Sequence, residues 1–399
     1  MPRKLQVGLF GFGTVGESLY HLLNGSPDAP AEIRHICVKN QDKARSLPTS
    51  SFTYHHDDVL EDDSLDLIVE AIDNADEAFE ISRQALRRGF NVVTANKKMV
   101  AYHLKELFAL QRETGHHMLY DAAVCGSIPI LRNVEEYYAL DNPHMISGIL
   151  NGSCNYILTQ LTRDPGKTSY DTVLQQAQDK GFAESDPSLD VAGYDALYKL
   201  IILAAHSYGV VARPEHVLRY GIQTVNSVDL AFAQARGKRL KLIGQAQRVE
   251  NQLGLMVLPK MVNAGDRLFY VEDEFNGVSV EAVAAGTHFY YGKGAGGNPT
   301  AYAMLSDIFA FQKAYHYGLN KVHNKLPLKA SESLPVRIYL RLPQDYQITL
   351  PVFEGEVEAH SMGDFTIMVG TTMLRELHGF VQTLDENNKN IMLAILEED

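Results

Sequence analysis

The stretch that decides the fold stands near the start of the chain, where residues 5–16 are Leu-Gln-Val-Gly-Leu-Phe-Gly-Phe-Gly-Thr-Val-Gly. Its apolar beginning, Leu5–Phe10, predicts a buried strand, and a helix is predicted at Val15–Leu23, behind the glycine-rich turn. A strand, a turn of the form GxGxxG and a helix, in that order, predict a loop that binds a dinucleotide. A glycine-rich turn without a ligand is the alternative.

Each residue of this turn has an expected role. Gly11 makes the tight turn, Gly13 lets the backbone approach a pyrophosphate, and Gly16 allows the helix to pack closely on the strand. Thr14 and Val15 open the helix, whose N-terminus supplies amide donors and the positive end of a dipole. All five residues are therefore candidate cofactor ligands.

The end of the next predicted strand, at residues 32–38, bears on which dinucleotide binds. A carboxylate there would bond the ribose 2′-hydroxyl of NAD, but Lys39 and Asn40 follow the strand, with Lys43 and Arg45 close behind. Because cations can accept a 2′-phosphate, the sequence favours NADP over NAD and makes Lys39 a candidate ligand. Solvated surface cations are the alternative.

Strand-like and helix-like segments alternate through residues 1–127, which predicts βαβ units and a mostly parallel sheet. The middle of the chain, residues 128–300, has the mixed pattern of an α+β domain. A long helix within residues 301–320 is expected to return to the first domain, and residues 321–332 resemble a linker. Residues 333–399 predict a small third domain with strands and one helix.

Composition excludes several classes of partner. The formal net charge of −13 argues against binding to nucleic acid or an anionic membrane, which would repel the chain. No apolar run is long enough to span a bilayer, and the first residues predict no secretory signal. Three cysteines without metal-ligand spacing fit a reduced cytoplasmic protein that binds a small-molecule substrate.

A carboxylate and a lysine near the middle of the chain are candidate catalytic groups. Asp195 and Lys199 are four residues apart, so they share one face of a predicted helix. Spacing alone is compatible with an ordinary surface ion pair. The apolar run at residues 200–205 instead predicts a buried helix, where charged groups need a partner or a task.

Five motifs together resemble the ordered signatures of homoserine dehydrogenases, over residues 5–320. They are Thr94-Ala95-Asn96-Lys97-Lys98, the stretches 122–129 and 148–158, the acidic stretch 181–199, and the glycine-rich loop 291–300. The resemblance implies reversible reduction of L-aspartate 4-semialdehyde to L-homoserine, in the biosynthesis of threonine, methionine and isoleucine. It also implies a homodimer or homotetramer, formed through strands of the middle domain.

The resemblance assigns roles to particular residues. Lys199 matches the catalytic lysine, Lys97 a second lysine for proton handling, and Asp195 the aspartate that positions substrate. The chemistry agrees, because hydride addition to an aldehyde builds negative charge on an oxygen that an ammonium can stabilise. The remaining matched positions are substrate ligands Glu184, Asp190, Gly152 and Ser153, and cofactor ligands Asn96 and Gly296.

The family also implies a monovalent cation, Na⁺ or K⁺, at the loop after the last strand of the nucleotide-binding domain. The matching positions are Asp121, Val124, Gly126 and Ile128. A plain tight turn is the alternative.

The predicted fold class is α/β: a Rossmann-type dinucleotide-binding domain, an α+β catalytic and dimerisation domain, and a small C-terminal ACT-like domain. The C-terminal domain lacks the acidic–x–Pro–Gly turn that normally forms an effector site, and Gln344–Thr349 stands in its place. We therefore expect this domain to have a structural or oligomerising role. Phe182 and Asp73-Asn74 depart from the family pattern. They leave open a related oxidoreductase acting on another amino-aldehyde, and a catalytically idle dinucleotide sensor is a further alternative.

Overall fold

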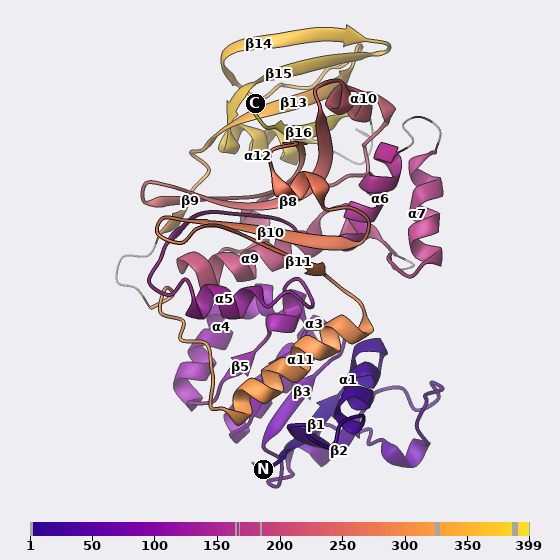
Figure 1. Cartoon of the computed structure of the whole chain (residues 1–399), viewed down its shortest axis with the longest axis vertical. Coiled ribbons are helices and arrows are strands. Elements are labelled where there is room, and N and C mark those ends of the chain that lie inside the picture. Colours follow the sequence, from indigo (N-terminus) through magenta and orange to yellow (C-terminus); the bar gives the residue numbers. More distant parts are fainter. Residues whose placement is uncertain are drawn as a thin grey trace. The chain divides into compact units, whose positions relative to one another are not determined.

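The computed structural model describes residues 3–163, 166, 168–183, 186–323, 328–384 and 390–398, and Figure 1 traces the chain. Its internal contacts divide it into two units, Met1–Ala139 with Lys293–Asn320, and Leu140–Gly292 with Lys321–Asp399. Both units combine helices with a sheet, which confirms the predicted α/β class. Within the described part of the chain, no helix is both long and apolar enough to cross a membrane.

The first unit is built on a parallel sheet with the strand order β2-β1-β3-β4-β5, and this confirms the Rossmann-type prediction. The strands are β1 (Leu5–Phe10), β2 (Ala31–Cys37), β3 (Leu67–Glu70), β4 (Asn91–Thr94) and β5 (Met118–Leu119). The helices are α1 (Thr14–Asn24), α2 (Asp57–Leu60), α3 (Ala75–Arg88), α4 (Lys97–Thr114), α5 (Ile130–Glu136) and α11 (Gly297–Gln312).

Local sequence explains where these helices begin and end. Asn74 and Asn96 cap α3 and α4, because each side chain accepts a hydrogen bond from an amide in the first turn. Gly89 and Gly115 end the same helices in the left-handed conformation. The cap at Asn96 starts α4 seven residues before the position expected from apolar periodicity, so Lys97 is its first residue.

The second unit contains one mixed sheet whose main path is β11-β10-β6-β8-β9-β16-β13-β15-β14. Its strands are β6 (Pro143–Ile149), β7 (Leu218–Arg219), β8 (Lys238–Val249), β9 (Gln252–Asn263), β10 (Phe275–Ala282), β11 (Gly286–Lys293), β12 (Lys329–Ala330), β13 (Pro335–Pro343), β14 (Phe353–Met362), β15 (Phe365–Met373) and β16 (Met392–Leu396). Its helices are α6 (Gly152–Arg163), α7 (Tyr170–Asp179), α8 (Ser188–Val191), α9 (Tyr194–Tyr208), α10 (Ser227–Ala235) and α12 (Leu374–Thr383).

The C-terminal segment joins this sheet rather than forming a separate one. β16 pairs in parallel with β9, and β13 pairs with β16 and β15 in antiparallel fashion (Figure 1). The order β16-β13-β15-β14 is the fourth, first, third and second strand of the segment, as in a ferredoxin-like unit. The described residues 344–352, between β13 and β14, contain no helix. The ACT-like assignment therefore stays a prediction.

Part of the segment expected to be a linker forms a strand. Lys329–Ala330 forms β12 and pairs in parallel with β9, and the Ser331 amide donates to the carbonyl of Leu253. The proline of that segment, Pro327, lies outside the described residues.

Candidate active site

The glycine-rich loop of the first unit has the geometry that its sequence predicted. Gly11 has a φ of 95°, and a Cβ there would lie 2.4 Å from the carbonyl oxygen of Ala71. A Cβ on Gly16 would lie 2.2 Å from the carbonyl oxygen of Gly11. By contrast, a Cβ on Gly13 would meet no atom within 4 Å, so open space lies beside the backbone that precedes Thr14. The loop is therefore packed on its protein side and open where a pyrophosphate would approach.

Two helices begin close together at this loop. Gly297, the first residue of α11, lies so near α1 that a Cβ on it would come within 2.8 Å of the Thr14 and Ser18 side chains. Gly296, which precedes α11, has a φ of 111°. Each helix N-terminus carries unpaired amide donors and a positive dipole end, so the pair favours an anion beside Thr14 and Val15.

The cations after β2 are already in contact with the protein. Lys39 Nζ lies 3.2 Å from a carboxylate oxygen of Glu77, with 82% of its side chain exposed. The Arg45 guanidinium donates to the carbonyls of Asn40 and Lys43 and lies 5.2 Å from the ring centroid of Phe52. Arg45 is half-buried, whereas the exposed Lys39 is free to reorient towards a ligand.

A buried carboxylate lies under the turn that holds Lys97. Glu70 ends β3 and is fully buried, and it accepts hydrogen bonds from the Thr94 hydroxyl at 2.5 Å and the Ile72 amide at 2.6 Å. The Asn96 amide in turn donates to the Thr94 hydroxyl. Burial raises the pKa of Glu70 to about 7. Sequence reasoning did not select this residue, although a charge at the end of an apolar strand needs a partner.

The predicted cation loop is a tight turn after β5. Cys125 and Gly126 have φ values of 56° and 51°, and the carbonyl of Cys125 accepts from the Ile128 amide. One carboxylate oxygen of Asp121 accepts from the amides of Leu131 and Arg132 at the start of α5. The oxygen donors that such a turn offers are of the hard type that Na⁺ and K⁺ prefer. The chemistry of these donors is compatible with a monovalent cation, which stays a prediction.

In the second unit, the catalytic candidates form a buried ion pair on α9. Lys199 Nζ donates to a carboxylate oxygen of Asp195 at 2.7 Å and to the carbonyl of Leu150 at 2.7 Å. The side chains are 6% and 5% exposed, which rules out the ordinary surface ion pair. Left-handed glycines, Gly193 and Gly209, flank α9 and fix where it begins and ends.

Asn151 connects this pair to a second carboxylate. Its side-chain amide donates to Asp190 at 2.8 Å and to Asp195 at 2.9 Å, and its side-chain oxygen accepts from the Cys154 amide at 2.7 Å. Sequence reasoning placed Asn151 beside the predicted substrate segment but did not assign it a role. The sequence signal that could have identified Asn151 as a site residue is its position directly before Gly152.

The start of α6 contributes the predicted glycine and serine. A Cβ on Gly152 would lie 2.4 Å from the carbonyl oxygen of Glu274, so only glycine fits there. The Ser153 hydroxyl donates to the carbonyl of Phe182 at 2.5 Å, and the Phe182 ring lies 5.0 Å from that of Tyr156. The backbone carbonyl of Phe182 therefore accepts a hydrogen bond from Ser153, and its ring packs against Tyr156.

Two further residues bear on this site. The Arg219 guanidinium lies 3.6 Å over the ring of Tyr194 and also donates to the carbonyl of Ala192, which fixes the entry to α9. Cys154 is buried, and burial raises the pKa of its thiol well above the usual value. A buried apolar role for Cys154 therefore fits better than a redox role.

The structure brings together one set of predicted residues in each unit. Lys199, Asp195, Asp190, Gly152 and Ser153 meet in the second unit. Lys97, Asn96 and the glycine loop belong to the first unit. Glu184 lies outside the described residues.

Two family models match this chain. Residues 129–309 match the model for homoserine dehydrogenase, and residues 11–121 match the model for the NAD-binding domain of homoserine dehydrogenase. The first range contains the network around Lys199, and the second contains the glycine loop and Lys97.

Relatives with the same name match most of the chain. The homoserine dehydrogenase of Bacillus subtilis is 36% identical over 326 residues, which are 79% of this chain and 75% of that protein. The homoserine dehydrogenase of Helicobacter pylori is 33% identical over 353 residues, 86% of this chain and 82% of that protein.

Solved structures agree with these relatives. The crystal structure of a homoserine dehydrogenase from Thiobacillus denitrificans is similar with a TM-score of 0.83 and 29% identity, covering 99% of both chains. A hyperthermophilic archaeal homoserine dehydrogenase in complex with NADPH is similar with a TM-score of 0.67 and 25% identity, covering 79% of this chain and 99% of that chain.

Proposed function

Because the chain belongs to the homoserine dehydrogenase family, we propose that it interconverts L-aspartate 4-semialdehyde and L-homoserine at the network around Lys199. The chain is an oxidoreductase with a nicotinamide dinucleotide-binding domain. The observation that carries the proposal is the buried ion pair of Lys199 and Asp195, held by Leu150 and Asn151. A catalytically idle dinucleotide sensor is not favoured, since this costly arrangement would then have no task.

The proposed chemistry assigns one proton to Lys199. A bound dinucleotide supplies the hydride, which adds to the aldehyde carbon and places the carbonyl electron pair on oxygen. The Lys199 ammonium donates a proton to that oxygen, which completes the alcohol, and solvent returns a proton to the amine. The reverse reaction removes the hydroxyl proton to Lys199. An ammonium positioned in a buried site stabilises the developing charge because little water competes with it.

The carboxylates serve the substrate's other end. Asp190 and Asp195 carry negative charge beside one another, and the amide of Asn151 bridges them. An α-ammonium group is the natural partner for such a pair, and the Ser153 hydroxyl and the backbone of Gly152 lie at the start of α6 beside it. Glu184, from the same acidic stretch, is proposed as a further ligand of the ammonium group.

The first unit is proposed to hold the cofactor through its glycine loop. Gly11, Gly13 and Gly16 shape the loop, while Thr14, Val15, Asn96 and Gly296 are the proposed ligands. Lys97, at the start of α4, is proposed as a second group for proton handling beside the nicotinamide.

We propose NADP as the preferred cofactor. Lys39 follows β2, where a carboxylate would select NAD, and it is exposed enough to meet a 2′-phosphate, with Arg45 close behind it in the sequence. The comparison of NADP with NAD, as kcat/KM with homoserine present, tests this preference. Equal values for the two dinucleotides would contradict it.

Three further parts of the proposal concern the protein's surroundings. A monovalent cation would be held by the loop of Asp121, Val124, Gly126 and Ile128 and would order that turn. The protein would act in the cytoplasm, because its three cysteines show neither metal-ligand spacing nor a disulfide framework. It would assemble as a homodimer or homotetramer through strands of the second unit.

Purified protein tests the proposed activity directly. With L-homoserine and NADP at alkaline pH, absorbance at the reduced nicotinamide band is expected to rise, and the product should react as an aldehyde. Omission of homoserine is the control. No turnover with either NADP or NAD would overturn the proposal.

A further inference from the structure

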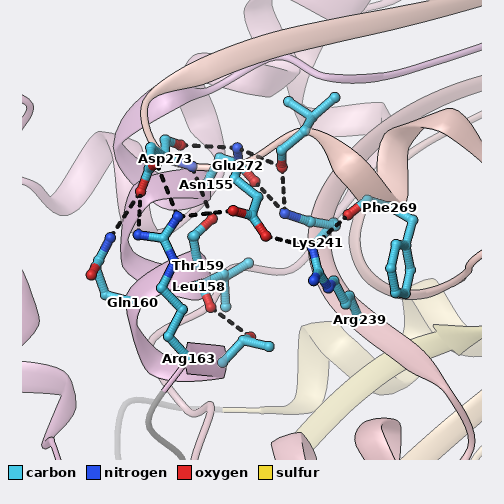
Figure 2. A network of polar contacts seen from close by, with 12 residues as sticks. Asn155, Leu158, Thr159, Gln160, Arg163, Arg239, Lys241, Phe269, Glu272 and Asp273 are labelled. Carbon is cyan, nitrogen blue, oxygen red and sulfur yellow. Dashed lines mark hydrogen bonds and ion pairs between the residues drawn. The ribbon is translucent and has the colours of Figure 1, made fainter.

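A cavity of about 290 Å³ lies in the second unit, beside the C-terminal half of α6, and Figure 2 shows the polar network around it. None of the described candidate catalytic or substrate residues lines it. The lining residues come from α6, α10, β8 and the segment before β10, and they are Thr159, Thr162, Arg163, Gln234, Gly237, Lys238, Arg239, Lys241, Phe269 and Glu272.

The lining is strongly cationic. Four basic side chains face this cavity, those of Arg163, Lys238, Arg239 and Lys241, against the single carboxylate of Glu272. Arg163 is 45% exposed, whereas Lys241 is 2% exposed, so the basic groups extend from the surface into the interior. A partly enclosed cavity of one sign concentrates ions of the opposite sign.

Lys241 is the unusual member of the set. Its Nζ donates to the side-chain oxygen of Asn155 at 3.1 Å and to the carbonyl of Val271 at 2.5 Å, and both acceptors are neutral (Figure 2). In the described part of the chain, no carboxylate forms an ion pair with it. Burial lowers the pKa of Lys241 to about 8, which reflects the cost of holding its charge there. A buried ammonium normally has a charged partner.

A purely structural network accounts for the two arginines but not for Lys241. Arg163 and Arg239 share Glu272, at 2.8 Å and 2.6 Å, and Arg163 also pairs with Asp273. Arg239 further lies 4.4 Å over the ring of Phe269. Two carboxylates, those of Glu272 and Asp273, thus balance the two guanidinium groups. Neither forms an ion pair with Lys241 in the described part of the chain, so the charge of Lys241 is the one left uncompensated.

We propose that this cavity binds a compact anion, with Lys241 at its base and Arg163 and Arg239 at its entrance. The anion supplies the negative charge that Lys241 lacks, since Glu272 and Asp273 already pair with the arginines. Thr159 and Gln234 line the same space, and the Thr159 hydroxyl and the second amide hydrogen of Gln234 can complete the hydrogen bonds of its oxygens.

The size of the cavity limits the ligand. At about 290 Å³ it lies at the lower end of the range for ligand pockets, which excludes a dinucleotide and suits phosphate or a small carboxylate. Both ligand classes present oxygens that guanidinium and ammonium groups bind well. Asn155, which accepts from Lys241, lies on α6 together with Ser153, so an anion here would adjoin the helix that opens the proposed substrate site.

A thermal titration tests the proposal. The protein is held with saturating dinucleotide, which occupies the glycine loop, and its melting temperature is followed against phosphate, acetate and succinate in separate series. Chloride at equal ionic strength is the reference. A saturable rise is expected, on the order of 5 °C when the anion exceeds its Kd about a hundredfold. The three series distinguish phosphate from carboxylate ligands.

Matched variants make the test specific. Lys241→Met should abolish the saturable rise, while Lys313→Met removes one exposed cation elsewhere and should retain it. If Lys241→Met fails to fold, Arg239→Gln is the second variant, in which Arg163 still pairs with Glu272. It should raise the midpoint anion concentration of the titration at least fivefold. The proposal is overturned if no anion exceeds chloride, or if the Lys241→Met and Arg239→Gln proteins respond like the parent.

Discussion

At the scale of single residues, the molecule places charges where water cannot reach them. Lys199 and Asp195 are each about one-twentieth exposed, and Glu70 is fully buried without a cation among its described contacts. Such groups cost stability, so their retention marks places where chemistry has a use for them. Substitutions of Lys199 and Glu70 test this.

Lys199→Ala is expected to lower kcat by about 10²–10⁴-fold, because it removes the positioned acid from the proposed substrate oxygen. The dinucleotide affinity should not change, since the glycine loop belongs to the other unit. Steady-state kinetics with homoserine and fluorescence titration of the reduced dinucleotide measure the two effects. Lys329→Ala, on the exposed β12, is the control. Normal turnover in Lys199→Ala would remove this lysine from the mechanism.

Glu70→Gln is expected to change how stability depends on pH. Because the folded protein holds the Glu70 proton up to about pH 7, stability falls as pH rises from the ordinary glutamate pKa to about 7, and it stays lower above that. The loss is about 3 kcal/mol in total. Glutamine keeps the acceptor for Thr94 without this titration. Between pH 5 and pH 8, the urea midpoint of Glu70→Gln should therefore fall less than that of the parent protein.

The control for that series is Glu113→Gln on the exposed face of α4. Its pH dependence should match that of the parent. A parallel loss of stability in the parent and in Glu70→Gln would show that Glu70 does not titrate in this range.

At the scale of elements, one buried ion pair attaches the C-terminal strands to the middle of the chain. Arg341 on β13 donates to both carboxylate oxygens of Asp229 on α10, and neither side chain is exposed. Its other donors reach the carbonyls of Thr224 and Asn390, and Tyr339 also donates to Asp229. Side chains thus join β13 to α10, in addition to the pairing of β16 with β9 that joins the C-terminal strands to the middle of the chain.

Arg341→Met is expected to destabilise the protein by about 3–5 kcal/mol, because Asp229 would remain buried and charged without its partner. The double variant Arg341→Met with Asp229→Leu should recover part of this loss, since two apolar side chains of similar volume can replace a buried pair. Urea unfolding of both variants and of Asp229→Leu alone measures the coupling. Additive losses would mean that the pair contributes no coupling energy.

The segment between β13 and β14 bears on regulation. Among the described residues 344–352 there is no helix, and the sequence Gln344–Thr349 lacks the acidic turn of an effector site. Millimolar threonine is therefore expected to inhibit turnover weakly or not at all. Initial rates against threonine concentration measure this, with serine as the control. Strong cooperative inhibition would show that the C-terminal segment is a sensor.

At the scale of the whole molecule, the sequence predicted the first unit well because its signals are local. The glycine turn and the apolar strand before it act within a few residues, whereas the cap at Asn96 was not recognised and the start of α4 was therefore missed. The ion pair of Asp195 and Lys199 was likewise predictable from helical spacing and the apolar run behind it.

What could not be predicted depends on residues far apart in sequence. The bridge from Asn151 to Asp190 and Asp195 spans about forty residues, and the pairing of β16 with β9 joins segments more than a hundred residues apart. β14 was missed although its apolar and acidic residues alternate, because glycine and four charged or histidine side chains weaken its strand propensity. Tertiary pairing, rather than local preference, forms that strand.

Neither unit is continuous along the chain, and this has a consequence for synthesis on the ribosome. The first unit includes Lys293–Asn320. During synthesis, α1 therefore cannot pack against α11 until long after residue 139 has left the ribosome. At the usual pace of translation that interval is roughly 10 to 40 seconds. During that interval the first unit lacks α11 and is incomplete. The face of α1 that α11 later covers is then exposed to chaperones and to neighbouring chains.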